Sequence, residues 1–157
     1  MNKPVVLTEE HLAAVAALEQ LCFAEPWSES ALKLLCHNAG LGVVIPAEEG
    51  NAVARAYGGL THVLDEGSIT NIAVRPDMRR QGLGRAVVVA LLDRAVEVGV
   101  TDVYLEVRIS NAAAIALYCS LGFETVGTRK NFYKLPTEDA YVMRWRAPHL
   151  TNENSTM

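Results

Sequence analysis

The feature that most constrains this 157-residue chain is a strand pattern that runs into a glycine-containing loop and then a helix. The strand pattern ends near Val74, and Gly82 and Gly84 open a proline-free stretch that continues to Val98. The first backbone N–H groups of a helix have no intrahelical partner, and glycines let a ligand approach them closely. With the helix dipole, such amides can bind a pyrophosphate. The sequence therefore predicts an anion-binding loop between a strand and a helix.

The glycine spacing separates the cofactor classes that use this arrangement. A P-loop requires Lys and then Ser or Thr at the end of its glycine run, but Arg85 follows Gly84. A dinucleotide-binding fingerprint requires Gly or Ala at a third position, where this chain has Val87. The P-loop is therefore excluded, and the dinucleotide fingerprint remains an alternative.

Hydrophobic periodicity and turn residues predict an α/β (α+β) chain that starts with two short helices. A strand, a helix and a second strand then follow one another over 68–107, which favours a parallel, right-handed crossover. A turn at 65–67 joins two strands of an antiparallel meander. The expected helices are 8–22, 28–40 (ended by Gly40), 82–98 and 110–121, and the expected strands are 41–45, 52–64, 68–74, 103–108, 124–133 and 140–145.

Length and composition favour one globular domain over 1–148, followed by a short polar tail at 149–157 that we expect to be disordered. No apolar run approaches the roughly 20 residues that span a bilayer, and the amino end lacks a secretory signal, so we expect a cytoplasmic protein and no membrane partner. The odd number of cysteines predicts buried free thiols at Cys22, Cys36 and Cys119.

A net charge of −4 argues against a broad nucleic-acid-binding surface. Four arginines within eleven positions nevertheless suit a small polyphosphate, although such clusters are more often solvated loop charge. These residues are Arg75, Arg79, Arg80 and Arg85. The histidines have no metal-ligand spacing, so no metal site is predicted.

The string Arg79-Arg80-Gln81-Gly82-Leu83-Gly84 resembles the Arg/Gln-x-x-Gly-x-Gly/Ala pattern of the GNAT N-acetyltransferases. The resemblance covers about residues 8–145, and within 71–123 it is strongest to the ribosomal-protein alanine N-acetyltransferases (RimI type). It implies the GNAT acyl-CoA N-acyltransferase fold, a mixed, mostly antiparallel sheet of about seven strands flanked by about four helices. The strings that carry the closer resemblance are 26–29, 105–108, 110–118, 121–123 and 129–133.

The resemblance also implies that acetyl-CoA is the acetyl donor. Its pantetheine arm would pair with the strand backbone at Ile72, Ala73 and Val74, which could equally be a core strand. Asn111 would approach the cofactor from the following helix, or it could simply cap that helix. The pyrophosphate would lie on the N–H groups of Arg80, Gln81, Gly82, Leu83, Gly84 and Arg85.

Two residues match the catalytic positions of the family. Glu106 resembles the general base, because an ammonium must lose a proton before its nitrogen can attack a thioester. As a strand residue opposite an apolar face, it could instead form a surface ion pair. Tyr118 resembles the general acid that protonates the departing thiolate, and its alternative is packing beside Ala114 and Ile115 at helical spacing. Direct transfer needs no covalent nucleophile.

The RimI-type resemblance implies that the acceptor is the α-amino group of a protein's first residue, typically the alanine of a small-subunit ribosomal protein. Its groove would be built from 23–28 and 132–134. The segment 134–139 is shorter than the family's usual hairpin, and this bears on acceptor specificity. Two alternatives remain open. One is a small-molecule amine or lysine side chain as acceptor, and the other is a non-catalytic acyl-CoA sensor, whose expected mark, loss of Glu106, is not seen.

Overall fold

The computed structural model describes residues 2–37 and 40–147, where one mixed sheet has the strand order β1-β2-β3-β4-β5-β7-β6. Neighbouring strands run antiparallel except β4 and β5, which are parallel. The expected mixed, mostly antiparallel sheet is therefore confirmed. The strands are β1 (Val5–Val6), β2 (Gly40–Ile45), β3 (Ala56–Val63), β4 (Glu66–Val74), β5 (Asp102–Arg108), β6 (Glu124–Tyr133) and β7 (Glu138–Arg146).

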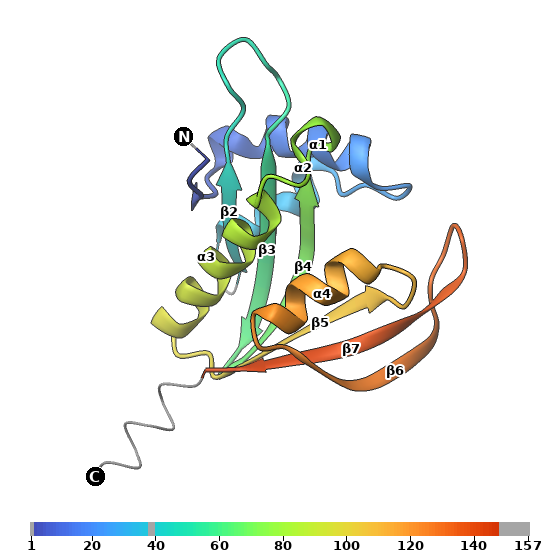
Figure 1. Cartoon of the computed structure of the whole chain (residues 1–157). Helices are drawn as coiled ribbons and strands as arrows, with labels where there is room; N and C mark the ends of the chain where they lie inside the picture. Colours follow the sequence, from blue (N-terminus) through green and yellow to red (C-terminus); the bar gives the residue numbers. More distant parts are fainter. Residues whose placement is uncertain (1, 38–39, 148–157) are drawn as a thin grey trace.

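The helices cover both faces of this sheet (Figure 1). Within the described residues these are α1 (Leu12–Cys22), α2 (Glu29–Leu32), α3 (Leu83–Glu97) and α4 (Ala112–Ser120), with short 3₁₀ turns at Glu9–His11, Lys33–Cys36 and Pro76–Met78. Helices α3 and α4 bury one core with residues such as Val88 and Leu91, while α1 and α2 bury a second with Leu18 and Tyr57. No helix in the described part of the chain is long and apolar enough to cross a membrane.

Strands β4 and β5 part from one another after a short paired stretch. Their parallel register joins Glu66–Ser68 to Asp102–Tyr104 and goes no further, and Figure 1 shows the two strands diverging from that end. Strand β4 also carries a bulge, because Ile69 pairs with Leu60 while Asn71 pairs with Gly59, which leaves Thr70 unpaired. A bulge re-aims the side chains that follow it. The result is a gap within the sheet.

Glycines lie at the predicted helix boundaries: one at the start of α3 and one after the end of each of α3 and α4. Gly82 precedes α3 with φ +82°, and Gly99 follows it with φ +93°. Gly122 follows α4 with φ +102°. Strand β5 has alternating burial, with Val103, Leu105 and Val107 in the core, also as predicted.

Several of the helix and strand boundaries predicted from the sequence were wrong. The second helix ends at Cys36, and Gly40 instead begins β2, where a Cβ would lie 1.8 Å from the Leu34 carbonyl oxygen. Strand β3 starts at Ala56 rather than 52. Val63 pairs with Glu66, so the hairpin turn is at 64–65 rather than 65–67. Strand β1 pairs with β2 as the seventh strand of the sheet, and the sequence patterns did not predict its position.

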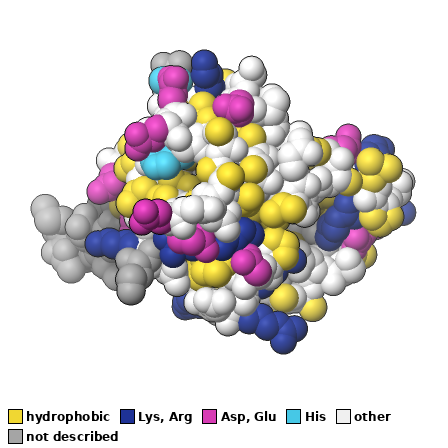
Figure 2. Space-filling model, turned by 90° about the horizontal axis from the view of Figure 1, so that it is seen from above, with side chains coloured by type: hydrophobic (Ala, Val, Ile, Leu, Met, Phe, Trp, Pro, Cys, Tyr) yellow, Lys and Arg dark blue, Asp and Glu magenta, His cyan; other side chains and the backbone are white. Residues whose placement is uncertain are grey.

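The cysteine prediction is partly wrong. All three are free thiols, and Cys22 and Cys36 are partly buried, but Cys119 is exposed because α4 turns that side chain away from the core. The predicted disordered tail at 149–157 lies outside the described residues. On the surface seen from above, Lys and Arg side chains lie among Asp and Glu side chains (Figure 2).

Candidate active site

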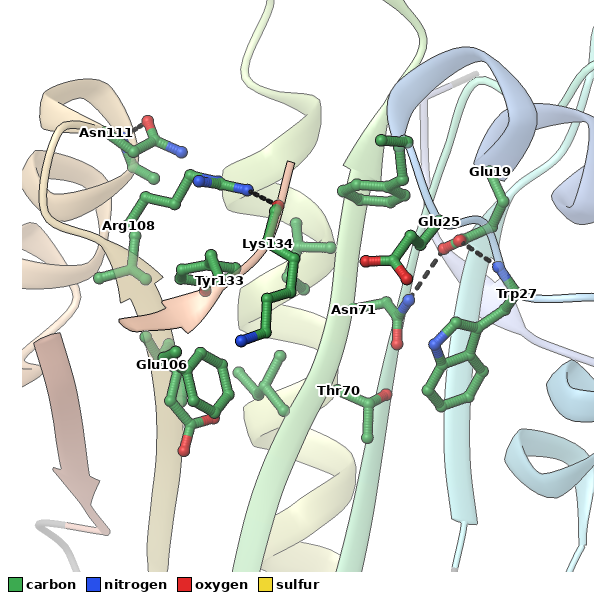
Figure 3. A pocket seen from close by; sticks show the side chains of 18 of the residues that line it. Glu19, Glu25, Trp27, Thr70, Asn71, Glu106, Arg108, Asn111, Tyr133 and Lys134 are labelled. Atoms are coloured by element: carbon green, nitrogen blue, oxygen red, sulfur yellow. Dashed lines mark hydrogen bonds between the residues drawn. The ribbon is translucent and has the colours of Figure 1, made fainter. Parts of the chain in front are cut away.

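A cavity of about 410 Å³ opens where β4 and β5 diverge. Figure 3 shows side chains from four parts of the chain pointing into it. One wall comes from the end of α1 and the loop after it, the floor from β4 and β5, and the other wall from α4 and the β6–β7 connection. The predicted groove segments are thus brought together, since the lining includes Phe23, Trp27 and the segment 132–134.

Glu106 lies on the face of β5 opposite the buried core residues and lines the cavity. Its side chain is 28% exposed, and Arg129 Nε lies 3.5 Å from its Oε2. The strand diverges from β4 after Tyr104, so Glu106 stands at the start of the gap. The ion pair of the second sequence-based possibility is therefore present, the carboxylate is also open to a ligand, and its role as general base stays a prediction.

Tyr118 reaches the same cavity from α4. It is 8% exposed and packs against Phe123, with ring centroids 5.6 Å apart. Burial, with a smaller contribution from Tyr133, raises the pKa of Tyr118 to about 12. The phenol therefore carries its proton at neutral pH. Core packing and a place at the cavity wall are both properties of this one side chain.

Asn111 acts as the N-cap of α4, and it also lines the cavity. Its Oδ1 accepts a hydrogen bond from the Ala114 N–H at 3.2 Å. The capping role is thus confirmed.

Sequence reasoning missed a buried carboxylate in the cavity lining, Glu19. Glu19 is fully buried and accepts hydrogen bonds from the Trp27 N–H at 2.8 Å, Asn71 Nδ2 at 2.9 Å and the Tyr57 hydroxyl. Burial, together with this carboxylate, raises the pKa of Tyr57. A signal existed, because Glu19 follows Val15 by four residues and so shares the apolar face of its helix.

The β6–β7 connection is fixed by Arg108 at the end of β5. Its guanidinium donates to the carbonyl oxygens of Lys134 and Pro136, both at 2.9 Å, and to Glu138 Oε1 at 3.1 Å. It also lies 4.5 Å above the centre of the Tyr133 ring. Burial first, and then the nearby Glu106 carboxylate, raises the pKa of Tyr133 to about 12. The wall opposite α1 is therefore held in place.

The start of α3 has the free amides that the glycine pattern predicted. The Ala86 N–H donates to the Gly82 carbonyl at 3.1 Å, and the amides of residues 83–85 have no backbone partner among the described residues. A Cβ on Gly82 would meet no atom within 4 Å, so the approach is open. Arg80 also has a positive φ, +65°. This loop does not line the cavity itself.

Strand β4 connects that loop to the cavity. Ile72 lines the cavity, while Ala73 and Val74 continue toward the loop on an edge that β5 no longer pairs. Arg79 Nε and the Cys22 thiol both donate to the Val74 carbonyl, at 3.2 and 3.5 Å. The strand edge therefore leads from the cavity to the loop before α3.

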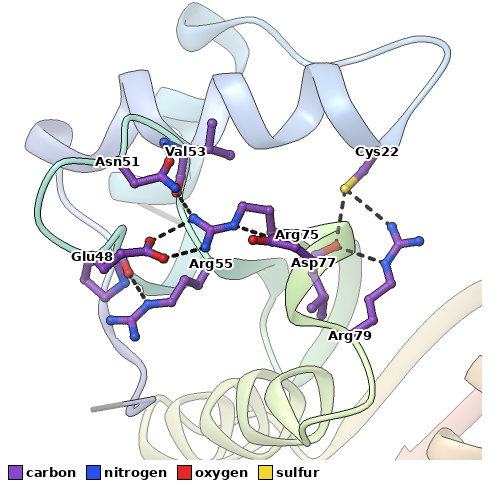
Figure 4. Close-up of polar contacts among 10 residues, drawn as sticks. Cys22, Glu48, Asn51, Val53, Arg55, Arg75, Asp77 and Arg79 are labelled. Atoms are coloured by element: carbon purple, nitrogen blue, oxygen red, sulfur yellow. Dashed lines mark hydrogen bonds and ion pairs between the residues drawn. The ribbon is translucent and has the colours of Figure 1, made fainter.

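The four arginines do not form one positive site, which corrects that prediction. Arg75 is 4% exposed and is held by Glu48 at 2.6 Å and Asp77 at 2.7 Å (Figure 4). Its hydrogen bonds lower the pKa of Glu48 to about 2. Arg85 donates to Ser120 at 2.9 Å. The strand end and the 3₁₀ turn direct these neighbouring side chains to different sides of the chain.

Within 2–37 and 40–147, no group of three or more His, Cys, Asp or Glu side chains is placed to hold a metal ion.

Comparison with known proteins agrees with this geometry. The sequence matches the Acetyltransferase (GNAT) family over residues 12–123. It is 44% identical over 147 residues to the [Ribosomal protein bS18]-alanine N-acetyltransferase of Escherichia coli K12, covering 91% of this chain and 96% of that protein. The crystal structure of the Escherichia coli ribosomal-protein-S18-alanine N-acetyltransferase superposes with a TM-score of 0.81 at 40% identity and 92% coverage of both chains.

A more distant structure shares the fold alone. Arabidopsis thaliana NAA60 in complex with acetyl-CoA has a TM-score of 0.80 at 16% identity, over 91% of this chain and 97% of that one. The fold, with its cavity between the diverging strands β4 and β5, is that of an acyl-transferring class of protein. The sequence match identifies the family within that class. The chain belongs to the GNAT family of acetyltransferases.

Proposed function

We propose that this protein transfers the acetyl group of acetyl-CoA to the N-terminal α-amino group of a protein, and that its acceptor is the N-terminal alanine of ribosomal protein bS18. The observation that carries the proposal is a cavity in which Glu106 and Tyr118 both lie, joined by the free edge of β4 to the start of α3. The near full-length match to bS18-alanine N-acetyltransferases supports the acceptor.

The residues present fit acetyl-CoA. The unpartnered amides of residues 83–85 suit a diphosphate, and the open space at Gly82 lets it approach. In this proposal the diphosphate lies on the backbone of residues 80–85, the pantetheine lies along 72–74, and Asn111 approaches from α4. Acetyl-CoA, when bound there, supplies an activated acetyl group as a thioester.

In the proposed reaction Glu106 prepares the acceptor. Its partly exposed carboxylate takes a proton from the ammonium, directly or through water, which frees a lone pair for attack on the thioester carbonyl. Arg129 already pairs with this carboxylate, so the incoming ammonium exchanges with or shares that partner. Holding amine and thioester together in the cavity replaces any covalent enzyme intermediate.

Tyr118 would act at the departing sulfur. Because burial raises its pKa to about 12, the hydroxyl is fully protonated at neutral pH but is a weak acid. It therefore hydrogen-bonds to the sulfur as negative charge develops, and its proton moves only as the C–S bond breaks.

The acceptor would enter between the loop after α1 and the β6–β7 connection. A peptide N-terminus is extended and carries one ammonium, and the cavity presents to it Glu25 from the loop after α1 and Glu106 from β5 (Figure 3). Such an acceptor would place the enzyme in the cytoplasm.

The test is a peptide library varied at its first three residues, incubated with acetyl-CoA and analysed by mass spectrometry. We expect acetylation of the α-amino group, with alanine preferred at the first position. Transfer only to lysine side chains or to small amines would reject the N-terminal acceptor. Binding of acetyl-CoA without any turnover would support a sensor instead.

A further inference from the structure

One amine of the protein itself borders the acceptor cavity. Lys134 lines the cavity together with Glu106 and Tyr118, and Figure 3 shows its side chain directed into the space between the two walls. All four lysines of the sequence are exposed, but Lys3, Lys33 and Lys130 do not line the cavity. Among the described residues, Lys134 is thus the one lysine that lines the cavity where an acceptor amine would react.

The backbone that carries Lys134 is anchored. Its carbonyl oxygen accepts a hydrogen bond from Arg108 at 2.9 Å, and Arg108 also holds Glu138 at 3.1 Å and covers the ring of Tyr133. These contacts come from β5 and β7, on either side of the connection that bears the lysine. The side chain therefore starts from a fixed point at the cavity rim.

The ammonium of Lys134 is not committed to another group. Among the described residues, no carboxylate forms an ion pair with it, although Glu25 and Glu106 line the same cavity. Glu106 pairs with Arg129 at 3.5 Å, a distance typical of a loose ion pair. Approach of the Lys134 ammonium to Glu106 would therefore break no ion pair of its own among the described residues, and it would compete only with the Arg129 contact.

From this placement we propose that Lys134 is a site of self-acetylation, modified in the protein's own active site when no acceptor peptide occupies the groove. This inference rests on the proposed function, since it uses the same donor and the same catalytic residues. The Lys134 side chain at the groove would then be a neutral acetyl-lysine instead of a cation, and its added acetyl group would occupy acceptor space.

The reaction balances with acetyl-CoA as the only co-reactant. Glu106 accepts a proton from the Lys134 ammonium and passes it to solvent, and the Nζ lone pair forms a C–N bond to the acetyl carbon. The C–S bond breaks, and the thiolate takes up one proton as the new amide nitrogen loses its second. The products are Nζ-acetyl-lysine, coenzyme A and one free proton.

The test is to incubate the full-length protein with acetyl-CoA in the absence of peptide and to map acetyl groups by mass spectrometry over time. We expect Lys134 to be labelled at least about tenfold faster than Lys3, Lys33 and Lys130, which report uncatalysed acetylation. The rate constant should not depend on protein concentration, and a saturating acceptor peptide should slow the labelling.

Two variants separate this step from chance reactivity. Glu106→Gln should lower Lys134 labelling to the rate of the other lysines, and Lys134→Arg should remove the fast phase from the intact mass. Equal labelling of all lysines, unchanged labelling of Lys134 in Glu106→Gln, or a rate constant that rises with protein concentration would overturn the proposal.

A parallel assay with an alanine-initiated peptide distinguishes the two proposals. Peptide acetylation without Lys134 labelling would reject self-acetylation and leave the proposed function intact. Lys134 labelling without peptide acetylation would support self-acetylation and reject the proposed acceptor. Absence of both would reject both.

Discussion

The two ends of the proposed active site are built in different ways. The donor end comes from one continuous segment, 72–85, and would act through backbone amides at the start of α3. The acceptor end is assembled from side chains that are distant in sequence, among them Glu19, Glu106 and Lys134. A backbone site tolerates changes of side chain but not of conformation, whereas the acceptor end depends on individual functional groups.

The largest expected effect comes from Glu106→Gln. Because it removes the proposed base and leaves the backbone of residues 80–85 untouched, turnover should fall by about 10² to 10⁴ while acetyl-CoA affinity stays near the wild-type value. Steady-state kinetics and calorimetry measure the two quantities. Glu124→Gln, at an exposed residue of β6, is the matched control. A wild-type rate in Glu106→Gln would remove the proposed base.

Glu19→Ala should give the next largest effect, on stability. The change leaves the Tyr57 hydroxyl, the Trp27 N–H and the Asn71 amide without their buried acceptor, so we expect a loss of about 3 kcal/mol in the free energy of unfolding. Urea denaturation measures it. Glu19→Gln keeps an acceptor oxygen and should lose less. Where the variant is still folded, acetyl-CoA should bind normally, and a lost donor site would show that the two ends are coupled.

Tyr118→Phe should lower turnover by about tenfold or more, because the sulfur loses its hydrogen-bond donor while the ring packing against Phe123 is kept. Since the pKa of Tyr118 is about 12, the wild-type pH profile should contain no ionisation of this phenol below about that pH. Unchanged kcat in the variant would assign Tyr118 to packing alone.

Gly82→Ala should have the smallest effect, and it acts on the donor end. With φ at +82° and open space around a new Cβ, the cost is backbone strain alone, about 1 kcal/mol of stability. Thermal unfolding measures the stability, and calorimetry should find weaker acetyl-CoA binding. Gly127→Ala is the control, because its Cβ also meets nothing within 4 Å and its φ is not left-handed. Equal effects at both positions would contradict the strain argument.

The backbone conformation of the proposed donor end could be predicted because its signal is local. Two glycines, a strand before them and a helix after them fall in one stretch, and the structure has the helix at Leu83–Glu97, within one residue of the expected bounds. The alternation in β5 placed Glu106 on the correct face for the same reason. Local patterns report backbone conformation and the faces of single elements.

The acceptor end could be predicted only in part. The sequence suggested its two flanking segments but not Glu19, whose partners lie 8, 38 and 52 residues away. The prediction of one positive site from the arginine cluster was wrong for the opposite reason, because residues close in sequence are directed apart. The turn after β4 separates them, and Arg75 pairs with Glu48 from a distant loop. Contacts between residues distant in sequence determine the positions and partners of charged side chains, and patterns in a single sequence do not contain this information.

Because pairing between β4 and β5 ends after Ser68, the backbone amides of β4 should differ in their rates of hydrogen–deuterium exchange. Strand β4 pairs with β3 along its length except at the bulge at Thr70, whereas its amides beyond Ser68 that face β5 look into a gap in the middle of the sheet. An interior strand therefore has one edge with the exchange behaviour of a sheet border. A ligand that adds to this edge would act as a missing strand segment, and its occupancy could be followed amide by amide as slowed isotope uptake.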